Sequence, residues 1–221
     1  LIALGPLSEA EAALREGADI ALRIHSLDNL LHLQAMLVSC LVLQGRLAEC
    51  PPLLDEAHAI IRREKMNRDF DCIEVRVADA GYRLALADSL QGAPRAAALA
   101  EAVKACRKGL SCAQRMPLWL PTMLRLQGRC DWLRGDQGAA QRSWQDSLKA
   151  AERSSFPVER GLTLLEMGQR TGDADKLRQA AQLFRQTGAR TYLSLAEPEA
   201  SETAADKAPA YGPWHGTDTA K

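Results

Sequence analysis

The stretch GDQGAAQRSWQDS, residues 135–147, places a small residue at Ala140, a large aromatic residue at Trp144 and a second small residue at Ser147. Intervals of four and three residues put these three side chains on one face of an α-helix. The Gly135-Asp136 pair in front of them marks a turn. The stretch therefore predicts a turn followed by a helix that buries Trp144 in the core.

The same small–large–small spacing recurs at three other places, each with a turn before it. The three sets are Ala10, Leu14 and Gly17; Cys50, Leu54 and Ala57; and Ala180, Phe184 and Thr187. A period of about forty residues is typical of stacked helix pairs. We therefore expect an all-α superhelix of antiparallel helix hairpins over residues 1–196.

Proline and glycine divide this region into nine expected helices. Pro51, Pro117 and Pro157 lie where prolines suit the first turn of a helix, while Gly45 and Gly135 lie at turns. The expected helices cover residues 8–24, 28–44, 51–66, 70–90, 95–115, 118–134, 137–153, 157–170 and 174–187. The short connections between them make neighbouring helices antiparallel.

The register of the middle pair, residues 70–115, has two solutions. The candidate core faces of its second helix are Leu99, Val103, Cys106 and Leu110, or Ala102, Cys106 and Gly109. Both faces follow a helical spacing, and the sequence does not choose between them.

The two ends of the chain differ from the array. Residues 1–4 read as the end of a helix that runs into Gly5-Pro6, so we expect the chain to begin inside a repeat of a larger protein. Residues 197–221 are rich in Pro, Ala, Ser, Thr, Gly and charged residues and have no helical period, so we expect a disordered tail. Its large apolar residues are Tyr211 and Trp214.

Composition and charge argue against several classes of partner. The chain has 28 Lys and Arg residues and 28 Asp and Glu residues, and its formal net charge is zero. A nucleic-acid-binding protein usually shows a basic excess or stripe, and a membrane span needs an apolar run of about 18 residues or more. Neither is present, so we expect a cytoplasmic protein without a nucleic-acid or membrane partner.

Residues that could carry chemistry are scattered along the chain. The six cysteines form no C-x-x-C pair, and the four histidines have no ligand spacing, so we expect reduced, structural thiols and neither a metal nor a cofactor. No Gly-rich phosphate loop and no nucleophile–base motif is present. We therefore expect no catalytic residue in this segment.

A partner-binding site is expected on the curved face that the first helix of each pair forms. The residues that we place there are Thr122, Arg125, Arg129, Trp132, His32 and Gln169. Two guanidinium groups one helical turn apart, beside an indole, can hold a carboxylate or an acidic peptide. Alternatively, Arg125 and Arg129 are solvated and paired with Asp131 or Asp136.

Two parts of the array resemble known proteins. Gly128, Ala140, Trp144 and Ser147 match the spacing of the tetratricopeptide repeat, although that family's usual period is about 34 residues. Residues 160–189 resemble the C-terminal repeat regions of large signalling proteins, which carry a nucleotide cyclase or protein kinase domain and an AAA-type ATPase module. Related arrays occur in ATPase-type transcription regulators of the maltose-regulator kind.

The resemblance implies a non-catalytic interaction or regulatory scaffold. Its partner would be a protein or peptide, including another domain of the same parent chain. The alternative is the effector-sensing repeat domain of an ATPase-type transcription regulator. The catalytic motifs of these families do not fall in this segment, so no catalytic residue is transferred to it.

Overall fold

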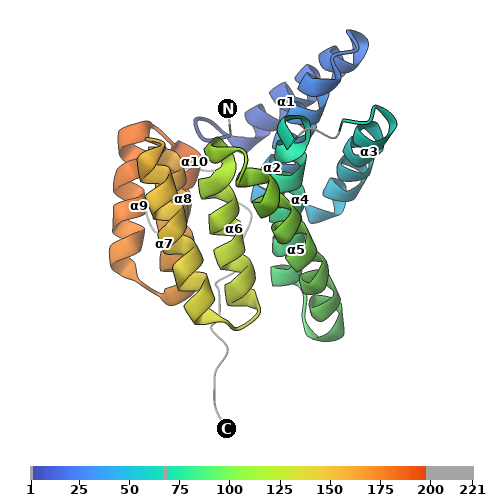
Figure 1. Cartoon of the computed structure of the whole chain (residues 1–221). Coiled ribbons are helices and arrows are strands. Elements are labelled where there is room, and N and C mark those ends of the chain that lie inside the picture. Colours follow the sequence, from blue (N-terminus) through green and yellow to red (C-terminus); the bar gives the residue numbers. More distant parts are fainter. Residues whose placement is uncertain (1, 67–68, 198–221) are drawn as a thin grey trace.

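The computed structural model describes residues 2–66 and 69–197, with side chains from residue 72 onward in the second range. The expected tail lies outside these residues except for Glu197. The described part of the chain is all-α, with no strand (Figure 1). Its helices are α1 (Leu7–Arg23), α2 (Leu27–Leu43), α3 (Cys50–Arg63), α4 (Asp69–Ser89), α5 (Gly92–Ala113), α6 (Leu120–Leu133), α7 (Gln137–Arg153), α8 (Pro157–Thr171), α9 (Ala174–Thr187) and α10 (Arg190–Ala196).

All nine predicted helices are present, and each end lies within a few residues of its predicted position. Single 3₁₀ turns, Leu47–Glu49 and Pro117–Trp119, lead into α3 and α6. The Asp136 carboxylate begins α7 by accepting a hydrogen bond of 2.8 Å from the amide of Ala139. The short helix α10 was not predicted, because a stretch of seven residues shows too little of the helical period to be recognised.

The helices form two rows. Helices α2, α4, α6 and α8 contact one another in succession, and we call the surface that they share the inner face. The hairpins α4–α5, α6–α7 and α8–α9 place α5, α7 and α9 on the outer side (Figure 1). Helix α3 packs more loosely on α4 than α5 does on α6, which leaves a gap between α3 and α5.

The repeated small–large–small face is the core of each hairpin, as predicted. Leu14, Trp144 and Phe184 are completely buried. A Cβ atom added to Gly128 would lie 2.3 Å from Cδ1 and Nε1 of Trp144, and one added to Gly161 would lie 2.5 Å from Cε1 of Phe184. Glycine in the inner helix therefore lets the aromatic side chain of the outer helix touch its backbone.

The middle hairpin takes the second of the two predicted registers. Ala102, Cys106 and Gly109 are buried, whereas Leu99, Val103 and Leu110 are only partly covered. A Cβ atom at Gly109 would lie 2.6 Å from Cε of Met123. The small face is the buried one because α5 approaches its neighbours too closely for branched side chains.

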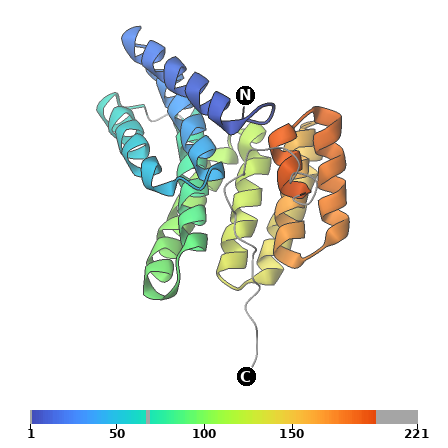
Figure 2. The ribbon, with the colours of Figure 1, turned by 180° about the vertical axis from the view of Figure 1, so that it is seen from behind.

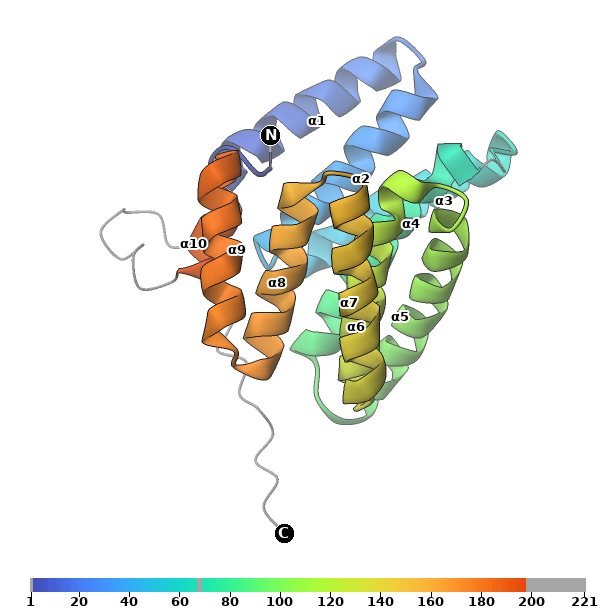
Figure 3. The same cartoon turned by 60° about the vertical axis from the view of Figure 1, so that its left-hand side comes forward.

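The last helix touches the beginning of the chain. Thr191 donates through Oγ1 to the carbonyl oxygen of Gly5 at 2.8 Å, and its amide lies 3.4 Å from the carbonyl oxygen of Ala3. Tyr192 packs between the first and last apolar clusters and contacts Phe184, with ring centroids 5.6 Å apart. Figures 2 and 3 show α10 beside the N-terminal part of α1. Within the described residues, no helix has the length and apolar character needed to cross a membrane.

Gly128→Ala should lower the free energy of unfolding by about 1–3 kcal/mol, because the new methyl group would collide with the buried indole of Trp144. Gly81→Ala is the matched control, since Gly81 is also inside a helix but has no atom within 4 Å of the position of the added Cβ. This control should stabilise the protein by about 0.5–1 kcal/mol. Urea unfolding measures both values, and an unchanged midpoint for Gly128→Ala would contradict the close approach.

Candidate functional site

The predicted binding residue Arg129 is buried on the inner face rather than exposed. Its side chain is 8% accessible, and Nε donates to Oδ2 of Asp88 at 2.9 Å. Arg170 donates to both oxygens of the same carboxylate, at 3.1 and 2.6 Å, and its Nε donates to Glu166 at 2.9 Å. Two arginines and two carboxylates thus join α4, α6 and α8 in one network.

The prediction that Arg129 is exposed is therefore wrong, and so is the alternative in which it pairs with Asp131 or Asp136. Asp131 instead accepts hydrogen bonds from Gln127 and Ser143. The partners of Arg129 come from helices about forty residues away on either side, so local spacing could not identify them.

Arg125 is half-buried and faces α8. Its Nε lies 3.6 Å from Oε2 of Glu159, an ion pair without a hydrogen bond. Thr122 is buried, at 7% accessibility, so it presents no open surface. Trp132 is partly buried against Trp144, with ring centroids 5.8 Å apart. These three predicted site residues all contact the interior of the array.

His32 and Gln169 also have partners within the chain. Nδ1 of His32 lies 2.7 Å from Oε2 of Glu74 and links α2 to α4. Nε2 of Gln169 donates to the carbonyl oxygen of Leu195 at 3.3 Å and links α8 to α10. The structure does not bring the six predicted residues together as one open site.

The network on the inner face pairs two positive charges, on Arg129 and Arg170, with two negative charges, on Asp88 and Glu166. Burial alone would raise the pKa of Asp88, but the charges and hydrogen bonds of Arg129 and Arg170 lower it below its ordinary value. The pKa of Glu166 is lowered in the same way, against the effect of burial, by Arg129 and Arg170. Both carboxylates therefore stay ionised at neutral pH and hold the two arginines.

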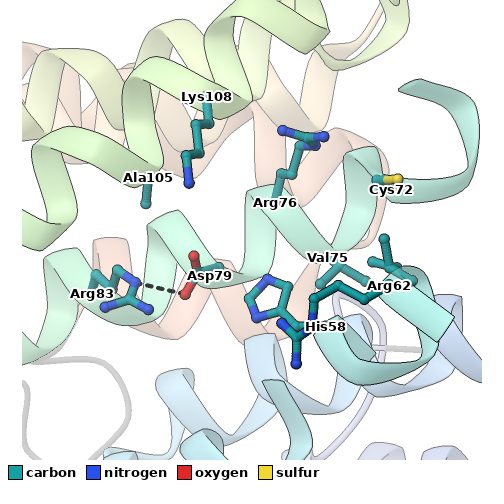
Figure 4. A pocket seen from close by; sticks show the side chains of 10 residues that line it. His58, Arg62, Cys72, Val75, Arg76, Asp79, Arg83, Ala105 and Lys108 are labelled. Atoms are coloured by element: carbon teal, nitrogen blue, oxygen red, sulfur yellow. Dashed lines mark hydrogen bonds and ion pairs between the residues drawn. The ribbon is translucent and has the colours of Figure 1, made fainter. Parts of the chain in front are cut away.

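A different group of charges lines a hollow of about 370 Å³ between α3, α4 and α5, which we call the basic groove (Figure 4). Its charged and titratable lining residues are His58 and Arg62 of α3, Arg76, Asp79 and Arg83 of α4, and Lys108 of α5. The groove lies where α3 stands away from α5.

Three cations of the basic groove have no counter-ion among the side chains that the structure describes. Asp79 is occupied by Arg83, whose Nε lies 2.7 Å from its Oδ1. Arg62, Arg76 and Lys108 form no ion pair with any side chain that the structure describes. Nε of Arg76 is buried and has no hydrogen-bond partner there. A buried donor without an acceptor costs free energy, so this atom is positioned to gain from a bound ligand.

The groove combines positive charge with apolar walls. Burial lowers the pKa of His58, and Arg83 and Arg62 lower it further against the opposing charge of Asp79, so the imidazole is neutral at pH 7. Apolar atoms of Val75 and Ala105 line the same hollow. Attraction between charges is stronger beside such apolar walls than in open water.

The next gap along the outer side has a different character. A more open hollow of about 650 Å³ lies between α5, α6 and α7, and its charged lining residues are Asp146, Lys149, Glu152 and Arg153. Its charges balance, and Lys149 pairs with Asp146 at 3.2 Å. Of these two hollows, the one beside α3 has the excess of positive charge.

Sequence reasoning missed the basic groove. Arg76, Asp79 and Arg83 follow each other at intervals of three and four residues, so a basic face on α4 could have been recognised. Its convergence with Arg62 and Lys108 depends on how three helices pack, which spacing along one helix does not reveal.

The described residues contain no group of three or more His, Cys, Asp or Glu side chains that could hold a metal ion. All six cysteines are buried. No family model matches the chain, and neither a curated protein nor a solved structure matches it. The class of the protein is thus given by its structure alone, which is all-α and built of packed helix hairpins within the described residues.

Asp88→Asn should lower the free energy of unfolding at pH 7 by about 3–5 kcal/mol, because it leaves two buried guanidinium groups without their shared carboxylate. Asp146→Asn, in an exposed ion pair, is the control and should change stability by less than about 0.5 kcal/mol. Urea unfolding measures both.

The contribution of Asp88 should also depend on pH. Because its folded pKa is lowered, the stabilisation is fully present above its ordinary pKa near 4 and is lost as the pH falls through the lower, folded value. The difference between wild type and Asp88→Asn should therefore shrink as the pH falls below about 4. A difference that stays constant down to the acid unfolding transition would contradict this assignment.

Proposed function

We propose that this chain is a non-catalytic helical-repeat interaction module that binds an anionic protein segment in the basic groove. The observation that carries the proposal is that Arg62, Arg76 and Lys108, from three helices, line one groove and form no ion pair within the described part of the chain. A folded protein gains nothing from like charges left unpaired along one groove, whereas an anionic partner would be attracted to them.

The inner face supports the proposal less well than the basic groove does. There Arg129 and Arg170 already share Asp88, and a carboxylate ligand would have to displace that buried ion pair. Removing one partner from a buried ion pair costs about 3–5 kcal/mol. Arg62, Arg76 and Lys108 of the basic groove could bind an anion without first breaking an ion pair within the described structure.

In this proposal the array is a tetratricopeptide-like region of a cytoplasmic, multidomain signalling protein with ATPase and cyclase or kinase domains. The bound segment would belong to another protein or to another domain of the same parent chain. The repeated hairpins and the resemblance of residues 160–189 support this placement.

The second candidate is an effector-sensing array of an ATPase-type transcription regulator. The volume of the groove, about 370 Å³, favours it, since small-molecule sites occupy roughly 300–1,000 Å³. A small anionic effector would then take the place of the protein segment.

Binding of a fluorescein-labelled oligoglutamate peptide, followed by fluorescence anisotropy, tests the proposal. The double variant Arg62→Glu/Lys108→Glu should weaken binding by at least about tenfold at low salt, because it reverses two charges of the groove. Wild-type affinity should fall as salt is added, since these side chains are exposed.

The matched control is Lys149→Glu/Arg153→Glu in the neighbouring gap, which changes the net charge of the protein by the same amount. It should retain wild-type affinity within about twofold if binding is local to the basic groove. Equal losses in the two double variants would mean that the peptide senses only the overall charge, and the proposal would be wrong.

A further inference from the structure

We infer that the group recognised in the basic groove is a phosphoryl group, and that the partner is a phosphorylated protein segment. This inference rests on the proposed function, because it names the chemistry of the ligand at the same site. It is carried by the charge of the groove, by the three helices that supply its donors and by the unused Nε of Arg76.

The charge of the groove matches a dianion better than a single carboxylate. With Arg83 held by Asp79, the side chains of Arg62, Arg76 and Lys108 leave an excess of three positive charges among the described lining residues. A carboxylate would neutralise one of them, whereas a phosphorylated side chain carries about −1.5 to −2 at pH 7. The dianion therefore relieves most of the mutual repulsion of the three cations.

The donors surround the hollow instead of lying on one side of it. Arg62 comes from α3, Arg76 from α4 and Lys108 from α5, and Figure 4 shows these side chains around a common hollow. A phosphoryl group has three acceptor oxygens that point in different directions, whereas a carboxylate has two in one plane. Donors on three walls suit the tetrahedral group.

Arg76 provides the most specific contact. Its buried Nε lacks an acceptor in the described structure, and a guanidinium group presents its donors as a rigid fork that can bind two phosphate oxygens at once. A lysine at this position would keep the charge but lose the fork. The geometry thus predicts that Arg76→Lys separates phosphoryl recognition from general attraction to anions.

The neighbouring gap shows what a groove without this function looks like. Asp146 and Glu152 line it together with two cations, so a phosphoryl group there would meet like charge. In the basic groove, Asp79 is the one carboxylate among the lining residues that the structure describes, and it is already bound to Arg83. The two gaps differ in charge although both lie between consecutive outer helices.

NMR of the arginine Nε–H groups in the full chain tests the inference directly. The probes are three alanine-rich peptides that differ only in a central phosphoserine, glutamate or serine, and free inorganic phosphate. The Nε–H signal of Arg76, identified by its absence in Arg76→Lys, should shift with the phosphoserine peptide. The glutamate peptide should need at least about tenfold higher concentration for the same shift, and the serine peptide should have no effect.

Two variants separate the site from overall charge. Arg76→Lys should reduce affinity for the phosphoserine peptide by about tenfold, measured from the remaining arginine signals, and should change affinity for the glutamate peptide by less than about threefold. Lys149→Gln in the neighbouring gap should change neither affinity. Circular dichroism should show the same helix content for wild type and both variants, since Arg76 forms no hydrogen bond or ion pair through its side chain within the described residues.

Each outcome distinguishes this inference from the proposed function. Equal binding of phosphoserine and glutamate peptides in the groove would overturn the phosphoryl assignment and leave the anion-binding module intact. A shift with inorganic phosphate but not with the phosphoserine peptide would overturn the protein partner and make the ligand a small phosphate compound. No shift of Arg76 with any probe would overturn both.

Discussion

The close approach of paired helices at glycine is the constraint on which the rest of the structure depends. Gly128 lies against the indole of Trp144, and Gly161 lies against the ring of Phe184. Any side chain at these glycines would push the outer helix away from the inner one. The positions of the outer helices α7 and α9 follow from these contacts.

Local periodicity explains why so much of the fold could be predicted. The spacing of Ala140, Trp144 and Ser147 reports the buried face of one helix directly, and the same spacing marks the other hairpins. The choice at Ala102 and Cys106 could not be made, because it depends on how closely α5 approaches α4 and α6. That distance is a property of tertiary packing, and helical spacing along α5 is compatible with both answers.

The candidate site was much harder to predict than the fold. Arg129 was expected on an open binding face, but it is buried by Asp88 and Glu166 from two other helices. Arg62 and Lys108, by contrast, lie in no distinctive local sequence pattern. They line a common groove only because α3 packs loosely on its neighbours. Charge pairing is decided by the partners that packing brings near, so the sequence shows the charges but not which of them remain unpaired.

The contact of α10 with Gly5 gives this array a property that an open solenoid lacks. In an open stack each repeat touches only its neighbours, so the end repeats can fray while the middle stays folded. Here the hydrogen bond from Thr191 to Gly5 and the packing of Tyr192 make the first and last hairpins neighbours as well. Unfolding of either end therefore removes contacts that stabilise the other end. The contact also restricts changes in the curvature of the array, which an open solenoid could undergo more freely.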